Sequence, residues 1–134
     1  MLKKLNHIAI AVPNLKTAIK SYKENFDAKI SKIRDLPEHG VRTAFVHLPN
    51  TNVELLEPLG DKSPIKKFLI NNPKGGIHHI CYEVADIKES INKLKMNNCN
   101  ILGEGIPREG AHGKLVVFIH PKEFNGTLIE LEEA

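Results

Sequence analysis

Two histidines and two glutamates are the residues of this chain whose types and settings best suit chemistry. His7 and His79 each stand directly before a short apolar run, and Glu54 and Glu130 each lie inside one. A carboxylate among apolar neighbours is costly to bury unless it is paired or binds a metal. Two imidazoles and two carboxylates suit a divalent ion of intermediate hardness, such as Co²⁺, Mn²⁺, Zn²⁺ or Ni²⁺. These four side chains therefore predict a metal site with positions left for substrate or water.

An internal repeat supports the grouping of these residues. HIAIAVPNLKTAIKSYK at 7–23 matches HICYEVADIKESINKLK at 79–95, FVH at 45–47 matches FIH at 118–120, and VEL at 53–55 matches IEL at 129–131. The spacing between partners grows along the chain, as loop insertions in duplicated modules would produce. A single histidine at a strand start is more often structural, and a single glutamate on a strand more often faces solvent. The recurrence of both types at equivalent positions favours a site near a pseudo-twofold axis.

The elements that must position these residues follow the same repeat. The apolar runs 8–12 and 80–84 predict strands. Asn14 and Asp86 are good N-caps for the amphipathic helices that follow, and Glu89 completes a capping box. Ser63-Pro64 starts a short helix between the halves. Further strands are predicted at 41–48, 53–56, 114–120 and 127–131.

This order predicts an α+β fold in which two βαβββ modules form an open, curved, mixed sheet. We expect one domain over residues 1–134, made of repeats 1–60 and 76–134 joined by a short helix and linker at 61–75. A module of this size alone would be only marginally stable, so the two should pack as one unit.

The composition of the chain argues against several classes of protein. The chain has 134 residues, 41% of them hydrophobic and 26% charged, with a net charge of +3, as in an ordinary globular domain. Aromatic residues make up only 5%, which argues against a nucleic-acid binder that stacks bases. Cys81 and Cys99 are too few for a disulfide framework. The apolar stretch near the N-terminus is too short for a signal peptide or a membrane span, so we expect a cytoplasmic protein.

The residues described above resemble the vicinal oxygen chelate superfamily and, within it, the methylmalonyl-CoA epimerase family. The resemblance covers nearly the whole chain. It rests on NHIAIAVPNL at 6–15, LPEHGV at 36–41, VELLEPLGDKSPIKKFL at 53–69, GGIHHICYEV at 75–84, GAHGK at 110–114 and HPKEFNGTLIELEEA at 120–134.

The resemblance implies a metal-dependent isomerase that interconverts (2R)- and (2S)-methylmalonyl-CoA, an acyl-CoA substrate and a homodimer. It makes His7, His79 and Glu130 metal ligands, with position 54 as the fourth. Some members of the family carry Gln where this chain has Glu54, and some carry a Glu, proposed as a base, where it has Thr43.

The implied reaction removes a proton from a carbon between a thioester carbonyl and a carboxylate. Inversion requires the proton to leave one face and return to the other, so Glu54 and Glu130 are the predicted catalytic residues. His112, between Gly110 and Gly113, has two open interpretations, a substrate-positioning residue or a surface loop residue.

Two other functions share the fold. A glyoxalase I type lactoylglutathione lyase would use the same four ligands, although the few arginines of this chain suit the carboxylates of glutathione poorly. A small-molecule binding protein of the same fold would carry no metal.

Overall fold

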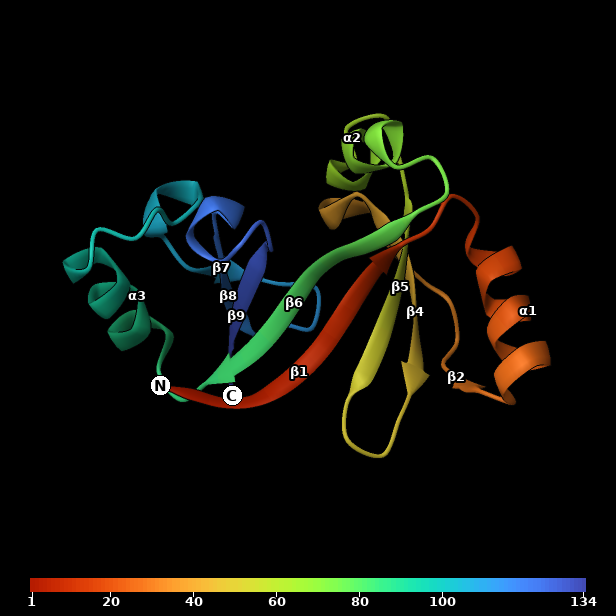
Figure 1. Ribbon diagram of the computed structural model, residues 1–134, viewed down its shortest axis with the longest axis horizontal. Coiled ribbons are helices and arrows are strands. Elements are labelled where there is room, and N and C mark those ends of the chain that lie inside the picture. Colours follow the sequence, from red (N-terminus) through yellow and green to blue (C-terminus); the bar gives the residue numbers. More distant parts are fainter. The chain divides into compact units, whose positions relative to one another are not determined.

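The computed structural model describes residues 1–134 and combines three α-helices with nine strands (Figure 1). The helices are α1 (Leu15–Phe26), α2 (Pro64–Asn71) and α3 (Ile87–Met96). The strands are β1 (Leu2–Ala11), β2 (Lys29–Ile30), β3 (Arg34–Leu36), β4 (Val41–His47), β5 (Asn52–Pro58), β6 (Gly76–Val84), β7 (Arg108–Glu109), β8 (Leu115–Ile119) and β9 (Ile129–Glu133). Strand β1 is parallel to β5 and β6 to β9, whereas β4–β5 and β8–β9 are antiparallel. The mixed sheet confirms the predicted α+β class.

The chain divides into two compact units. We call residues His7–His78 the N-terminal unit, and residues Met1–Asn6 with His79–Ala134 the C-terminal unit. In the N-terminal unit the strands are ordered β2-β4-β5-β1, with β3 also paired to β4, and in the C-terminal unit β6-β9-β8-β7. The order β1-β5-β4 of one unit thus matches β6-β9-β8 of the other. The assignment of the whole chain to a single domain stays a prediction.

The long helix of each unit begins at the residue that the sequence predicts. The backbone N–H of Thr17 donates to Oδ1 of Asn14 over 2.9 Å, and that of Glu89 donates to Oδ1 of Asp86 over 3.0 Å. Each cap satisfies an N–H that has no partner within its helix.

A second carboxylate holds each of these helix starts to a strand. The backbone N–H of Leu15 donates to Oε1 of Glu57 at the end of β5, and that of Ile87 donates to Oε2 of Glu133 at the end of β9, both over 2.9 Å. The same type of hydrogen bond, from a backbone N–H to a glutamate, therefore fixes α1 and α3 to the strands that carry Glu54 and Glu130.

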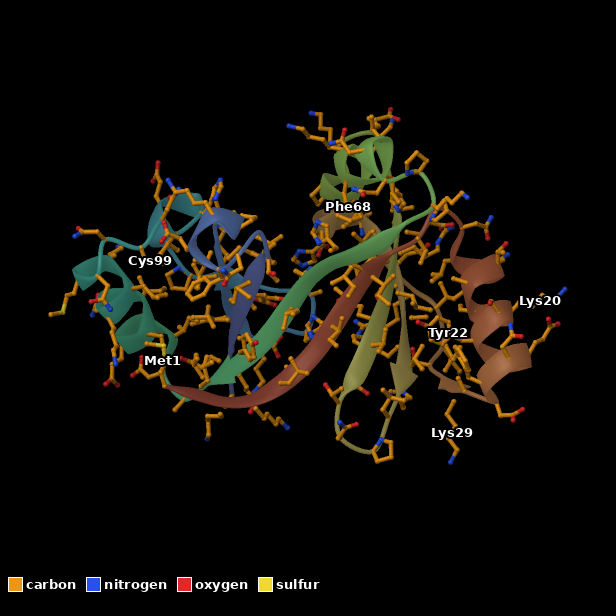
Figure 2. All side chains as sticks on the ribbon, in the orientation of Figure 1. Met1, Lys20, Tyr22, Lys29, Phe68 and Cys99 are labelled. Atoms are coloured by element: carbon orange, nitrogen blue, oxygen red, sulfur yellow. The ribbon has the colours of Figure 1, made fainter.

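Each helix covers one face of its own strands. In the N-terminal unit, Leu15 of α1 packs with Val46 and Leu55, and in Figure 2 Tyr22 points from α1 toward the strands while Lys20 points away. In the C-terminal unit the corresponding cluster is formed by Ile87, Ile91, Val117, Ile119, Ile129 and Leu131. Because side chains alternate across a strand, the residues between these core positions face the other side of the sheet.

The first strand of each half is longer than predicted. β1 begins at Leu2 and β6 at Gly76, so His7 and His79 lie inside strands rather than before them. The sequence does not show this extension of β1, because its first residues are polar. Lys4 and Asn6 both contact Glu83 on β6 rather than packing in a core. Strands β2, β3 and β7 were not predicted, since two or three residues carry no periodicity. None of the helices is both long and apolar enough to cross a membrane.

Candidate functional site

The N-terminal unit contains a buried histidine–glutamate pair. Nε2 of His7 on β1 lies 3.4 Å from Oε1 of Glu54 on β5, and their side chains are 1% and 5% exposed. In the parallel register Ala9 lies opposite Glu54, so His7, two residues earlier, projects to the same face. Phe45 of β4 sets its ring edge-on to the imidazole, with centroids 6.3 Å apart.

Thr43 holds the other oxygen of this glutamate. Its hydroxyl donates to Oε2 of Glu54 over 3.1 Å, and both residues are buried. His7 and Thr43 thus engage one carboxylate oxygen each. These two contacts fix the orientation of the Glu54 carboxylate.

The C-terminal unit contains an equivalent pair. Nε2 of His79 on β6 lies 3.0 Å from Oε2 of Glu130 on β9, with side chains 7% and 8% exposed. Phe118 of β8 meets the His79 ring edge-on at 5.5 Å and lies opposite Glu130 in the register, as Phe45 lies opposite Glu54. The repeat read from the sequence therefore extends to the contacts around each pair.

Each pair offers one imidazole nitrogen and one carboxylate oxygen in a nearly dry setting. Such a pair can be a hydrogen-bonded ion pair, which is a weak source of stability because both groups lose water. It can also supply two ligands to a divalent ion. The alternative that Glu54 and Glu130 face solvent is wrong, because the two residues are 4% and 6% exposed.

A further histidine–glutamate pair lies in the C-terminal unit. Nδ1 of His112, in the loop between β7 and β8, is 3.2 Å from Oε2 of Glu132 on β9. The sequence left the role of His112 open and did not single out Glu132. The sequence does contain a signal for Glu132, because this residue follows Glu130 by two positions and so shares its face of the strand.

Other histidines have structural contacts. His78 packs edge-on against Phe68 of α2, with ring centroids 5.3 Å apart. The backbone N–H of Lys122 donates to Nδ1 of His120, which caps a short 3₁₀ turn. His39 also ends a 3₁₀ turn.

Three groups elsewhere have shifted pKa values. The side-chain hydrogen bond from Arg42 lowers the pKa of Asp35, and the same bond raises the pKa of Arg42. Burial, followed by the nearby charge of Glu123, raises the pKa of the Cys99 thiol. None of these groups belongs to the two buried pairs.

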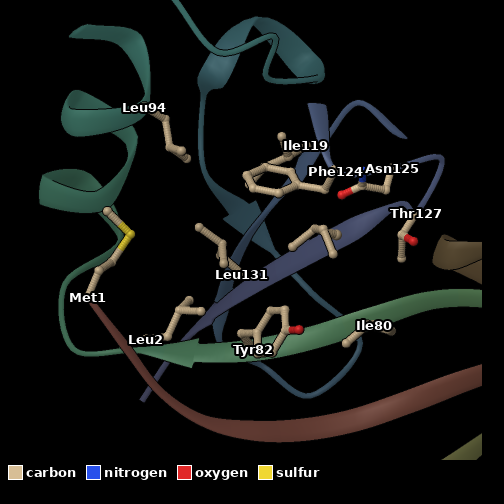
Figure 3. Close-up of a pocket in the computed structure, with 11 residues that line it drawn as sticks. Met1, Leu2, Ile80, Tyr82, Leu94, Ile119, Phe124, Asn125, Thr127 and Leu131 are labelled. Carbon is tan, nitrogen blue, oxygen red and sulfur yellow. The ribbon is translucent and has the colours of Figure 1, made fainter. Parts of the chain in front are cut away.

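A cavity of about 460 Å³ lies on the helix side of the C-terminal unit (Figure 3). Ile80 and Tyr82 of β6 and Ile129 and Leu131 of β9 line it together with Leu94 of α3. These strand residues alternate with His79 and Glu130, so the cavity opens on the opposite face from the pair. We therefore place the candidate site by its chemistry rather than at this cavity.

Comparison with known proteins agrees with the arrangement of elements. Residues 6–118 match the family model of the Glyoxalase/Bleomycin resistance protein/Dioxygenase superfamily. The chain belongs to this superfamily.

Its relatives identify the family more closely. The ethylmalonyl-CoA/methylmalonyl-CoA epimerase of Cereibacter sphaeroides is 53% identical over 99% of both chains. The mitochondrial methylmalonyl-CoA epimerase of Dictyostelium discoideum is 55% identical over 97% of this chain and 78% of its own. A variant of Streptomyces coelicolor methylmalonyl-CoA epimerase, solved with 2-nitronate-propionyl-CoA, has a TM-score of 0.90 at 28% identity and covers 100% of this chain and 99% of its own. Within the superfamily, this chain is a member of the methylmalonyl-CoA epimerase family.

Proposed function

We propose that this protein is a methylmalonyl-CoA epimerase, which interconverts the (2R) and (2S) forms of methylmalonyl-CoA. The observation that carries the proposal is 53% identity to a curated epimerase along essentially the whole of both chains. The buried histidine–glutamate pair in each unit gives that likeness a chemical basis.

The proposed cofactor is one divalent metal ion held by His7, Glu54, His79 and Glu130, one pair from each unit. The donor set fits, because two imidazoles and two carboxylates match Co²⁺, Mn²⁺, Zn²⁺ or Ni²⁺. When bound, the ion polarises the thioester carbonyl and so favours loss of the proton at C2. Phe45 and Phe118 orient the two imidazoles through their edge-on contacts.

The chain itself must move the proton. In our proposal Glu54 and Glu130 are the catalytic residues, one removing the C2 proton from one face and the other returning a proton to the opposite face. The hydroxyl of Thr43 donates to Oε2 of Glu54, which leaves Oε1 as the oxygen that can take up the proton. Thr43 cannot serve as the base that the family resemblance implies at its position, since a hydroxyl is not basic near neutral pH.

We further propose a homodimer that works in the cytoplasm on an acyl-CoA. The mild net charge of +3 would help to attract an anionic substrate. The oligomeric state can be measured by light scattering during gel filtration.

The direct test follows deuterium entering C2 of methylmalonyl-CoA in D₂O, with the purified protein as isolated, after chelation, and after each metal is restored. We expect epimerisation that chelation removes and readdition recovers. Ethylmalonyl-CoA belongs in the same assay because the Cereibacter sphaeroides relative is named for both substrates. Lactoylglutathione formation without C2 exchange would favour the lyase, and full activity after complete metal removal would reject the proposed cofactor.

A further inference from the structure

The pair formed by His112 and Glu132 is not needed by any role assigned above. The His112 side chain is 24% exposed, whereas that of Glu132 is 7% exposed. The loop that carries His112 is closed by a hydrogen bond from the N–H of Gly110 to the carbonyl of Lys114 over 2.8 Å. A half-buried imidazole is thus held over a buried carboxylate.

This pair lies on the same face of the sheet as the pair of His79 and Glu130. Ile129 and Leu131 belong to the core against α3, so Glu130 and Glu132 both project to the other side of β9. Two residues along a strand separate the two carboxylates by roughly 7 Å of chain. His112 therefore reaches the face that carries the candidate ligands of this unit.

The N-terminal unit shows that the fold does not require a carboxylate here. Leu56 follows Glu54 by two residues, as Glu132 follows Glu130, and it packs with Val41 and with Ile65 of α2. An apolar side chain thus fills the equivalent position without the cost of burying a charge. The carboxylate in the C-terminal unit calls for a chemical reason.

We propose that His112 is a further catalytic residue of the epimerase, exchanging the C2 proton with the substrate, and that Glu132 is its positioning residue. This rests on the proposed function and assigns to His112 the proton transferred by the C-terminal unit. His112 thereby replaces Glu130 as the proton carrier of the C-terminal unit, and Glu130 serves only as a metal ligand.

The geometry suits this role. A carboxylate that accepts from Nδ1–H fixes the imidazole tautomer and makes Nε2 the nitrogen that exchanges protons, as in other histidine–carboxylate pairs. In the forward step the C2–H bond breaks, the proton moves to Nε2, and the electron pair stays on the substrate as an enolate. In the reverse step the N–H bond breaks and the C2–H bond forms again, so no other reactant is required.

The test uses the His112→Gln chain with pure (2R)- and pure (2S)-methylmalonyl-CoA in D₂O. Deuterium at C2 is measured separately in remaining substrate and in product. The loss of one of two proton carriers should lower epimerisation by about 100-fold or more. One epimer should still exchange its C2 proton with retention of configuration, at a rate close to that of the unchanged chain, while the other stops exchanging.

Surviving exchange of one epimer also shows that the variant is folded. Glu132→Gln should give the same one-sided loss, weaker in size, with kcat reduced and KM nearly unchanged. His47→Gln is the matched control, because His47 is exposed and bonds only locally to Asn52, over 3.0 Å; both epimers should exchange normally.

Three outcomes overturn the assignment. The His112→Gln chain could epimerise as fast as the unchanged chain, lose exchange of both epimers together, or lose activity only through KM. A complete lack of epimerisation in the unchanged chain would instead reject the proposed function, and the assignment would fail with it.

Discussion

At the scale of single residues, the two buried glutamates do not have identical surroundings. His7 and Thr43 contact the two oxygens of Glu54, whereas the neighbour two residues beyond Glu130 is a second carboxylate, Glu132, paired with His112. The two modules thus carry the same histidine–glutamate pair, whereas the groups around the two pairs differ. We connect this asymmetry with a reaction whose substrate is chiral and must be handled differently on its two faces.

Glu54→Gln separates the ligand role of this residue from its base role. The amide keeps an oxygen for the metal and for Thr43 but cannot carry a proton, so we expect bound metal to remain and kcat to fall by about 100-fold or more. Elemental analysis and the epimerase assay measure the two effects. Glu38→Gln, at an exposed turn, is the control; undiminished turnover of the Glu54→Gln chain would reject the base role.

The thiol of Cys99 should be slow to react at neutral pH. Burial and the charge of Glu123 raise its pKa above the ordinary 9.0, so less of it is present as the reactive thiolate at any given pH. We expect the iodoacetamide rate at Cys99, followed by mass spectrometry of its peptide, to keep rising above pH 9. Removing the charge in Glu123→Gln should shift that profile to lower pH, and a profile that levels off near pH 8 would contradict the assignment.

At the scale of elements, Glu57 and Glu133 hold the starts of α1 and α3 to β5 and β9, the strands that carry Glu54 and Glu130. Replacing Glu133 with Ala removes the acceptor for the N–H of Ile87 and should cost about 1–2 kcal/mol in the free energy of unfolding. Glu57→Ala should cost more, because Glu57 also accepts from Arg42 over 3.3 Å. Urea unfolding measures both.

Glu24→Ala provides the baseline for these two variants. Glu24 is exposed and pairs only with Lys20, four residues earlier on α1, and such pairs contribute about 0.3–0.5 kcal/mol. Equal, small effects of all three variants would show that the carboxylates do not hold the helix starts.

The elements of this chain were largely predictable because their signals are local. Caps at Asn14 and Asp86 and the apolar runs that follow are readable residue by residue, and the repeat confirmed each reading with a second copy. The start of β1 was not predictable, because its polar residues pair with Glu83, which is far away in the sequence. The bond between Thr43 and Glu54 also needed the structure, since only the register of β4 on β5 brings them together.

At the scale of the whole molecule, the chain is a duplicated module, and each copy carries one buried histidine–glutamate pair. Each unit supplies half of the proposed ligand set, so neither copy alone would complete the metal site.

Metal binding should stabilise the folded chain. A ligand present at 100 times its Kd adds about 2.7 kcal/mol to the free energy of unfolding, provided that it binds only the native state. For a chain of this length that corresponds to a rise in Tm of roughly 10 °C. Calorimetry with and without metal measures it, and a Tm that does not respond to any of the four proposed ions would contradict the site.

The most direct measurement is the number of divalent ions bound per chain by the unchanged protein, by His7→Ala and by His79→Ala. We expect one ion per unchanged chain and almost none in either variant, because each substitution removes a proposed ligand from the same centre. Two ions per chain, with each variant retaining one, would contradict it and would show that the two histidine–glutamate pairs act as separate sites.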